Sequence, residues 1–94
     1  MQVLSDREKT HGNFADVALL DQSLKALLYS SRNWEKLDDE HKLALEMVAH
    51  KISRILCGNP KEEDHWRDIA GYAELGRRSC KVMFTVSPTV TSGA

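Results

Sequence analysis

Apolar residues recur every three or four positions in three stretches of the chain, and polar segments separate these stretches. In the first stretch the recurring residues are Phe14, Val17, Leu20, Leu24, Leu27 and Leu28. This spacing places them in one stripe along an α-helix. Asn13, with Asp16 three positions later, has the pattern of a capping box at the start of a helix. The first stretch therefore predicts a helix from about Phe14 to Tyr29.

The second stretch follows the polar segment SSRNWEK, in which we expect Trp34 to fold back against the core. Asp38 or Asp39 is placed to cap a second helix, and Gly58 is placed to end it. The buried stripe of this helix is predicted to consist of Ala44, Leu45, Val48, Ile52, Ile55 and Leu56.

The third stretch begins at Asn59-Pro60, where asparagine is suited to cap a helix and proline to its first position. It predicts a helix from about Pro60 to Arg78, with an apolar face of Trp66, Ile69, Ala70 and Ala73. The segment KVMFTV, residues 81–86, is rich in β-forming residues and is expected to form a short strand that could pair with a neighbouring subunit. The final SPTVTSGA is expected to be a flexible tail.

These elements predict an all-α protein, a small bundle of three principal helices with a short extended C-terminal segment. The helical domain would comprise residues 1–79, and the extended or flexible tail residues 80–94. A chain of 94 residues is near the lower limit for folding alone, although 41% hydrophobic residues support a core. Because short chains often gain stability by association, we expect a homo-oligomer.

Composition excludes several classes of partner. A net charge of −1, from 13 basic and 14 acidic residues, argues against bulk binding of nucleic acid but is compatible with a small phosphate ligand. No apolar run is long enough to span a membrane, and the start MQVLSDREKTHG has no signal-peptide stretch. We therefore expect a cytosolic protein in which Cys57 and Cys80 stay reduced. These cysteines form no recognisable zinc or redox motif.

Two of the predicted helices carry polar residues close to their apolar faces. On the second helix Lys51 falls near the centre of the apolar face, with Arg54 at its edge. On the third helix His65, Asp68 and Tyr72 form a stripe. The short Gly-Asn-Pro turn would make the two helices antiparallel and bring the five side chains together.

Two interpretations of these residues remain open. Lys51 and Asp68 form either a buried ion pair that sets the register of the helices or part of a ligand site. In the second case His11, near the start of the first helix, could contribute. Gly71 and Gly76 would let the helices approach closely or leave room for a ligand.

A metal site is the weaker alternative. Glu46 and His50 share one side of the second helix with Ser53, a side expected to face solvent or a partner. Asp64 and Asp68 have the same four-residue spacing as Glu46 and His50, which suggests a divalent cation between the helices. The nearby lysine and arginine would repel a cation, so we expect no metal, with Glu46, Asp64 and Asp68 as the alternative set. The segments HGN and CGN have one glycine each and do not form a phosphate loop.

Three blocks, REKTHGNFAD, HKISRILCGNP and DHWRDIAGYAEL, resemble a family of small proteins encoded by tailed phages and prophages. The resemblance covers about residues 7–76 and implies a location in the cytoplasm of an infected bacterial host. It also suggests a more distant similarity to all-α nucleotide pyrophosphohydrolases of the MazG type. Those enzymes hold magnesium with Glu-x-x-Glu and Glu-x-x-Asp motifs on neighbouring helices. Here Glu46 stands alone, and Asp64 and Asp68 are four positions apart, so the acidic set is incomplete.

Three functions remain in competition. The main hypothesis is a phage accessory protein that binds, and sequesters, a nucleotide or cyclic-nucleotide host immune signal without a cofactor. Its ligand-binding residues would be Lys51, Arg54, His65, Asp68, Tyr72 and His11. The second hypothesis is a divergent MazG-like enzyme that uses Mg²⁺ to hydrolyse a nucleotide. The third is a protein-binding inhibitor of a host defence complex.

Overall fold

The computed structural model describes residues 8–85, with side chains described as far as Cys80. A helical turn at residues 8–11 precedes α2 (Phe14–Tyr29), the short 3-10 helix η1 (Trp34–Lys36), α3 (Asp39–Cys57) and α4 (Glu63–Thr85). No strand occurs within this part of the chain. The fold is therefore an all-α bundle of three principal helices, as the sequence predicts.

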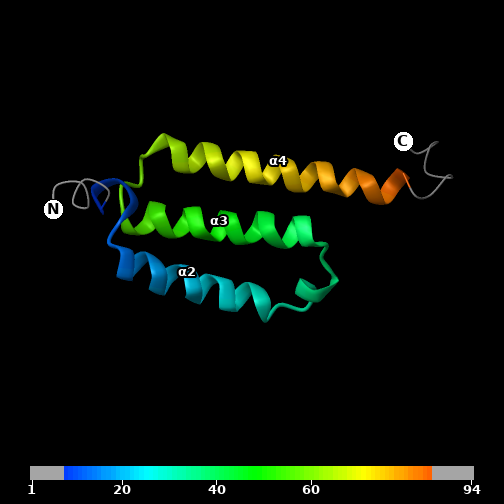
Figure 1. Cartoon of the computed structure of the whole chain (residues 1–94), viewed down its shortest axis with the longest axis horizontal. Helices are drawn as coiled ribbons and strands as arrows, with labels where there is room; N and C mark the ends of the chain where they lie inside the picture. Colours follow the sequence, from blue (N-terminus) through cyan, green and yellow to red (C-terminus); the bar gives the residue numbers. More distant parts are fainter. Residues whose placement is uncertain (1–7, 86–94) are drawn as a thin grey trace.

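The three long helices lie side by side, with α3 between α2 and α4 (Figure 1). Successive helices run in opposite directions. The shortest dimension of the molecule is 17 Å, which is less than two helix diameters. The bundle is therefore one helix thick, and only α3 has a helix on each side. None of the described helices is long and apolar enough to cross a membrane.

The start of α2 is set by the predicted cap. The backbone N–H groups of Ala15 and Asp16 donate hydrogen bonds of 2.9 and 3.2 Å to Oδ1 of Asn13. Those two donors have no partner within the helix, so the asparagine satisfies groups that would otherwise need water. The observed bounds, Phe14 to Tyr29, are those predicted.

Helix α4 differs from its prediction at both ends. It begins at Glu63, not Pro60, because a turn comes first. In that turn Asn59 accepts hydrogen bonds from the N–H groups of Lys61 and Glu62. It continues to Thr85, so the extended conformation expected over residues 80–85 is wrong. No glycine or proline interrupts the sequence from Arg77 to Thr85, and helical hydrogen bonding continues despite the β-forming residues. Residue 86 and the expected tail lie outside the described residues.

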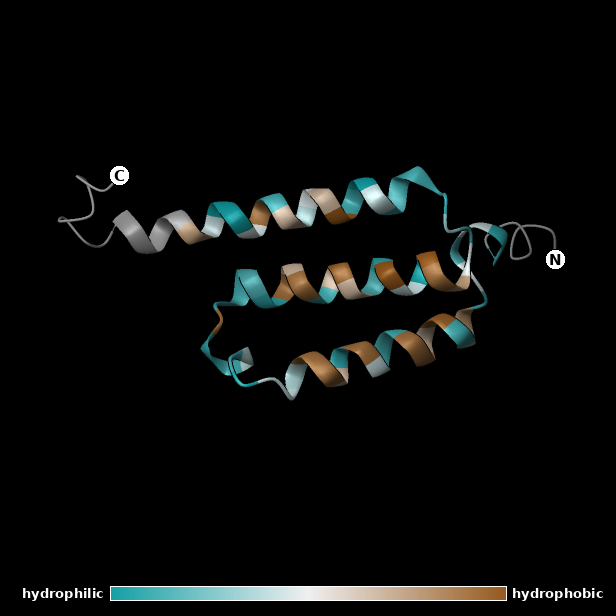
Figure 2. Cartoon of the chain, turned by 180° about the vertical axis from the view of Figure 1, so that it is seen from behind, coloured by the Kyte–Doolittle hydropathy of each residue, from teal (hydrophilic) through white to brown (hydrophobic). Residues whose placement is uncertain are grey.

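The core is small, and several residues predicted to be buried are not. The buried apolar side chains are Val17, Trp34, Ala44, Ala49 and Ile55. Trp34 does fold back as predicted, with its ring 5.0 Å from that of Tyr29. Seven members of the predicted stripes, by contrast, are exposed: Phe14 and Leu27 on α2, Leu45 and Leu56 on α3, and Trp66, Ala70 and Ala73 on α4. In a single layer each helix has too few neighbours to cover a wide stripe, and apolar residues line the open faces of α2 and α3 (Figure 2).

The side of α3 expected to face solvent or a partner instead packs against α2. Ser53 is completely buried, and its hydroxyl donates to the carbonyl of Ala49. Glu46 accepts a 2.6 Å hydrogen bond from the hydroxyl of Tyr29. The expectation for this side was wrong because α2 and α4 flank α3 on opposite sides, so that both sides are interfaces.

Candidate functional site

Two glycines bring the N-terminal turn into contact with the turn between α3 and α4. Gly12 has a φ of +92°, and a Cβ atom there would lie 2.8 Å from the backbone of Cys57. A Cβ atom on Gly58 would lie 2.4 Å from the carbonyl oxygen of Thr10. That oxygen accepts a 3.0 Å hydrogen bond from the N–H of Asn59. The segments HGN and CGN therefore form a backbone contact that closes one end of the bundle.

A pair of histidines lies beside this contact. His65 on α4 is 1% exposed, and its Nε2 is 3.3 Å from Nδ1 of His11. The same Nε2 is 3.4 Å from the carbonyl oxygen of Thr10. Two imidazole nitrogens can share a hydrogen bond only when one carries a proton and the other does not. The pair therefore joins α4 to the N-terminal turn.

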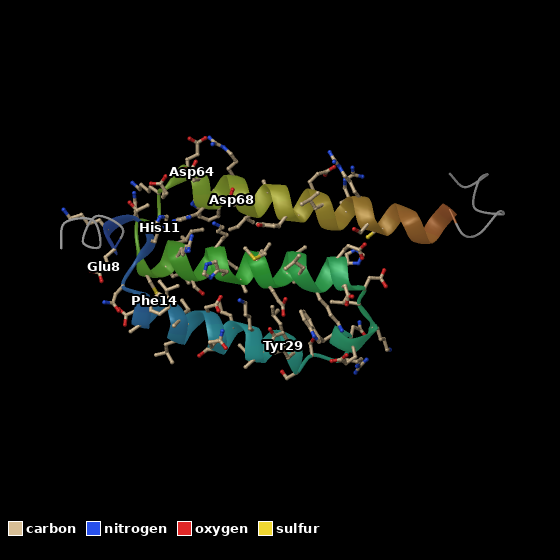
Figure 3. All side chains as sticks on the ribbon, in the orientation of Figure 1. Glu8, His11, Phe14, Tyr29, Asp64 and Asp68 are labelled. Atoms are coloured by element: carbon tan, nitrogen blue, oxygen red, sulfur yellow. The ribbon has the colours of Figure 1, made fainter. Side chains whose placement is uncertain are left out.

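His11 also lines a cleft of about 240 Å³ at this end of the molecule. The cleft lies between the helical turn at residues 8–11, the start of α2 and the last turns of α3. It is lined by Glu8, His11, Gly12, Phe14, Val17, His50 and Arg54. Glu8, His11 and Phe14 lie close together at the end of the bundle (Figure 3), and the Phe14 ring is 83% exposed.

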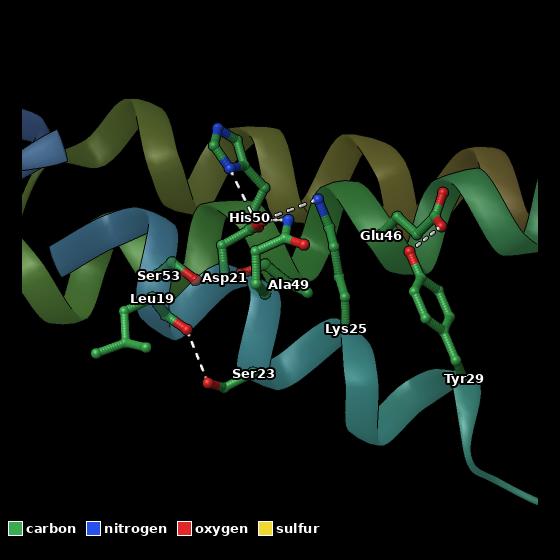
Figure 4. Close-up of polar contacts among 10 residues, drawn as sticks. Leu19, Asp21, Ser23, Lys25, Tyr29, Glu46, Ala49, His50 and Ser53 are labelled. Carbon is green, nitrogen blue, oxygen red and sulfur yellow. Dashed lines mark hydrogen bonds and ion pairs between the residues drawn. The ribbon is translucent and has the colours of Figure 1, made fainter. Parts of the chain in front are cut away.

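The buried carboxylate of Asp21, which does not line the cleft, contacts the cleft residue His50. Asp21 is 6% exposed and lies 3.3 Å from Nδ1 of His50, 3.2 Å from Nζ of Lys25 and 3.1 Å from Nε2 of Gln22 (Figure 4). Burial raises the pKa of this carboxyl, but Lys25 and the other donors outweigh burial and hold the pKa below its usual value. Burial, together with the charge of Arg54, lowers the pKa of His50 although Asp21 opposes the shift. Near neutral pH, His50 is therefore a neutral ring that donates from Nδ1 to Asp21.

The predicted ligand residues are divided among three places. Lys51 and Asp68 form the predicted ion pair between α3 and α4, with 2.9 Å between Nζ and Oδ2, and Lys51 lowers the pKa of Asp68. Tyr72 lies on α4 beside a different hollow, which Asp68 also lines. Arg54 lines the cleft with His11, and His65 lies behind His11. The prediction that these residues form a single cluster was wrong. Arg54 lies at the edge of the apolar face of α3 and points toward α2, whereas Lys51 points toward α4.

The alternative metal set is not assembled either. Glu46 faces α2 and binds Tyr29, whereas Asp64 and Asp68 lie on α4 and pair with Arg67 and Lys51 respectively. Within residues 8–80, no three His, Cys, Asp or Glu side chains are grouped so that they could hold a metal ion. Glu46 faces α2, whereas Asp64 and Asp68 lie on α4 at the opposite side of α3, because α3 is the middle helix.

The sequence pattern missed the roles of Asp21, His50 and the two glycine segments. A signal for Asp21 was present, since it lies one helical turn from both Val17 and Leu24, within the apolar stripe of α2. An acid at such a position needs buried partners. The contact between Gly12 and Gly58 had no comparable signal, because residues so far apart meet only after the helices pack.

The fold and the cleft define a class of small all-α protein: a single layer of three helices with a cleft at one end that holds one arginine and two histidines. The chain belongs to the family described as Domain of unknown function (DUF6378), whose model matches residues 1–80. That match includes every residue of the cleft. No curated protein and no solved structure matches the chain.

Proposed function

We propose that this protein binds the phosphate group of a nucleotide or cyclic nucleotide in the cleft lined by His11, His50 and Arg54, and holds the ligand without converting it. The observation that carries the proposal is that one cavity is lined by the Arg54 guanidinium and the His50 imidazole, both from α3, and by the His11 imidazole from the N-terminal turn. In the phage setting that the sequence resemblance implies, the bound nucleotide would be an immune signal of the host.

The chemistry of the lining residues suits a phosphate ester. Arginine presents paired N–H donors to phosphate oxygens, and a partly enclosed site strengthens that attraction. The cleft, at about 240 Å³, is smaller than typical ligand pockets of about 300 Å³ or more. It would therefore hold the phosphate and part of the sugar, and the base would stack on the exposed ring of Phe14. Glu8 is placed at the wall to accept a hydrogen bond from a sugar hydroxyl.

Binding would be coupled to proton uptake. A neutral His50 that donates to Asp21 from Nδ1 has no proton on Nε2 to offer a phosphate. A bound phosphate would favour the protonated ring, which can donate from both nitrogens. We therefore expect affinity to increase as the pH is lowered from 8 to 6.

Sequestration is preferred to hydrolysis on geometric grounds. A magnesium-dependent pyrophosphohydrolase needs several carboxylates around the metal. Glu46, Asp64 and Asp68 each have a different partner, Glu46 lies on the opposite side of α3 from the other two, and none of the three lines the cleft.

The test is a thermal-shift and calorimetric screen against linear and cyclic nucleotides, with and without magnesium. We expect stabilisation without magnesium, recovery of the intact nucleotide by chromatography, and at least tenfold weaker binding by Arg54→Ala. Arg67→Ala, on the exposed side of α4, is the matched control and should bind normally. Equal binding by Arg54→Ala, or no binding of any nucleotide, would refute the proposal. Magnesium-dependent consumption of the nucleotide would favour the enzyme instead, and copurification of a host protein would favour the inhibitor.

A further inference from the structure

An apolar groove runs between α3 and the C-terminal half of α4, on the side of α3 away from α2. The groove has a volume of about 360 Å³ and adjoins a second hollow of about 560 Å³ that α4 residues alone line. The two hollows share Tyr72, Leu75 and Arg78. From α3, Glu40, Leu43 and Ala44 line the smaller hollow. None of these residues lines the cleft of the proposed nucleotide site.

Large apolar side chains remain exposed along this groove. Leu43, in the second turn of α3, is 57% exposed, and Leu75, near the middle of α4, is 54% exposed. Among the described residues, nine large apolar side chains are exposed and only five apolar residues are buried. Exposed apolar surface on this scale is typical of a protein interface.

The register of α3 and α4 shows what kind of surface fits the groove. Lys51 pairs with Asp68 at 2.9 Å, and Nε2 of His41 lies 3.4 Å from Sγ of Cys80. Between these two contacts the helices run antiparallel. Leu43 is therefore level with Leu75, and one turn further along Glu40 is level with Arg78. In the smaller hollow α3 thus contributes Leu43 and Glu40 and α4 contributes Leu75 and Arg78, and the two charges are opposite. Arg78 also pairs with Glu74 on its own helix, at 3.0 Å.

We propose that a second copy of this chain covers the groove, with a two-fold axis parallel to the helices. A two-fold axis in this direction places α3 of one protomer over α4 of its partner. Each Leu43 then packs against a Leu75, and each Glu40 faces an Arg78. An interface between identical copies must be complementary to itself, and the pairing of Leu43 with Leu75 and of Glu40 with Arg78 meets that requirement.

The resulting interface is a four-helix bundle made of two α3–α4 pairs. Every helix in it would have antiparallel neighbours, so that opposite ends of the helix dipoles lie side by side. The net charge of −1 per chain adds little repulsion between the copies.

Light scattering coupled to size-exclusion chromatography tests the proposal on the full chain. The wild type should elute with the mass of a dimer. Leu43→Glu and Leu75→Glu should each weaken association at least 100-fold and elute as helical monomers. Leu19→Glu and Leu27→Glu are matched controls, since these leucines are 72% and 69% exposed on α2, outside the groove, and both variants should remain dimeric.

A charge exchange tests the orientation of the two copies. Glu40→Arg alone and Arg78→Glu alone should each weaken the dimer because like charges then face one another. The double variant should recover most of the lost association. A monomeric wild type at about 100 μM, a dimer unaffected by Leu43→Glu, or a double variant weaker than both single variants would overturn the proposal. The nucleotide cleft lies outside this interface, so a monomeric variant should still bind nucleotide. Failure of one proposal can therefore be told apart from failure of the other.

Discussion

Gly12 has no side chain, but its backbone makes a contact on which the shape of the cleft depends. Its backbone is left-handed and lies against the backbone of Cys57, while Gly58 lies against Thr10. This contact holds the helical turn at residues 8–11 over the end of α3, and so forms one wall of the cleft. A residue with a Cβ atom would meet backbone there, which cannot move as a flexible side chain can.

Gly12→Ala should lower the free energy of unfolding by about 2 kcal/mol, because alanine adopts this conformation with strain and clashes with Cys57. Gly71→Ala is the matched control. No heavy atom lies within 4 Å of a Cβ atom at Gly71, and alanine is the better helix former, so stability should rise by about 1 kcal/mol. Urea unfolding followed by circular dichroism measures both. Equal effects of the two substitutions would show that the Gly12 contact is not structural.

Helices α2 and α3 are each preceded by a residue type that can cap a helix, but only one of the two side chains makes cap hydrogen bonds. Asn13 is hydrogen-bonded to two backbone N–H groups at the start of α2. Asp38 occupies the same position before α3, yet its side chain makes no cap hydrogen bond. Its negative charge still interacts favourably with the helix dipole.

Asn13→Ala should therefore destabilise the protein by about 1 kcal/mol, the usual cost of losing a cap. Asp38→Ala should cost roughly half of that or less, since only the weak dipole interaction is lost. Thermal unfolding of the two variants at the same concentration gives the comparison. If Asp38→Ala proves the more damaging of the two, the assignment of the caps is wrong.

Across the whole molecule, histidines make several of the contacts between elements. His50 joins α3 to Asp21 on α2, His11 joins His65 on α4, and His41 on α3 lies 2.9 Å from the carbonyl oxygen of Gly76 on α4. Because a single layer buries few apolar residues, these polar contacts contribute more to the packing of the helices than they would in a bundle with a large apolar core.

The stability of the free protein should consequently fall on mild acidification. The pKa of His50 is lowered from its ordinary value of 6.5, so between that value and the folded-state pKa the unfolded chain binds more protons. The contribution of His50 is therefore fully present above pH 6.5 and is lost as the pH falls through the lowered folded-state pKa. Urea titrations from pH 7.5 to 5 should show a smaller pH dependence for His50→Gln, which keeps a donor for Asp21. An unchanged dependence would mean that His50 contributes none of it.

The periodicity of apolar residues, together with Asn13 and Gly58, was enough to predict three helices, the exact bounds of α2 and the end of α3. These features depend on neighbours in sequence. The Lys51–Asp68 pair was also predictable, because a short turn forces α3 and α4 to be antiparallel and the charge pattern then selects the register.

The sequence alone did not determine how the helices are arranged around α3. A stripe pattern predicts which face of a helix is apolar but not how many neighbours cover it. Only the tertiary structure shows a single layer, in which Ser53 is buried and Leu43 and Leu75 are exposed. His50 and Arg54 are neighbours on one helix, but His11 joins them in the cleft only because two glycine turns pack backbone to backbone. Such contacts depend on the free energy of the whole packed chain, and no local pattern of residues encodes them.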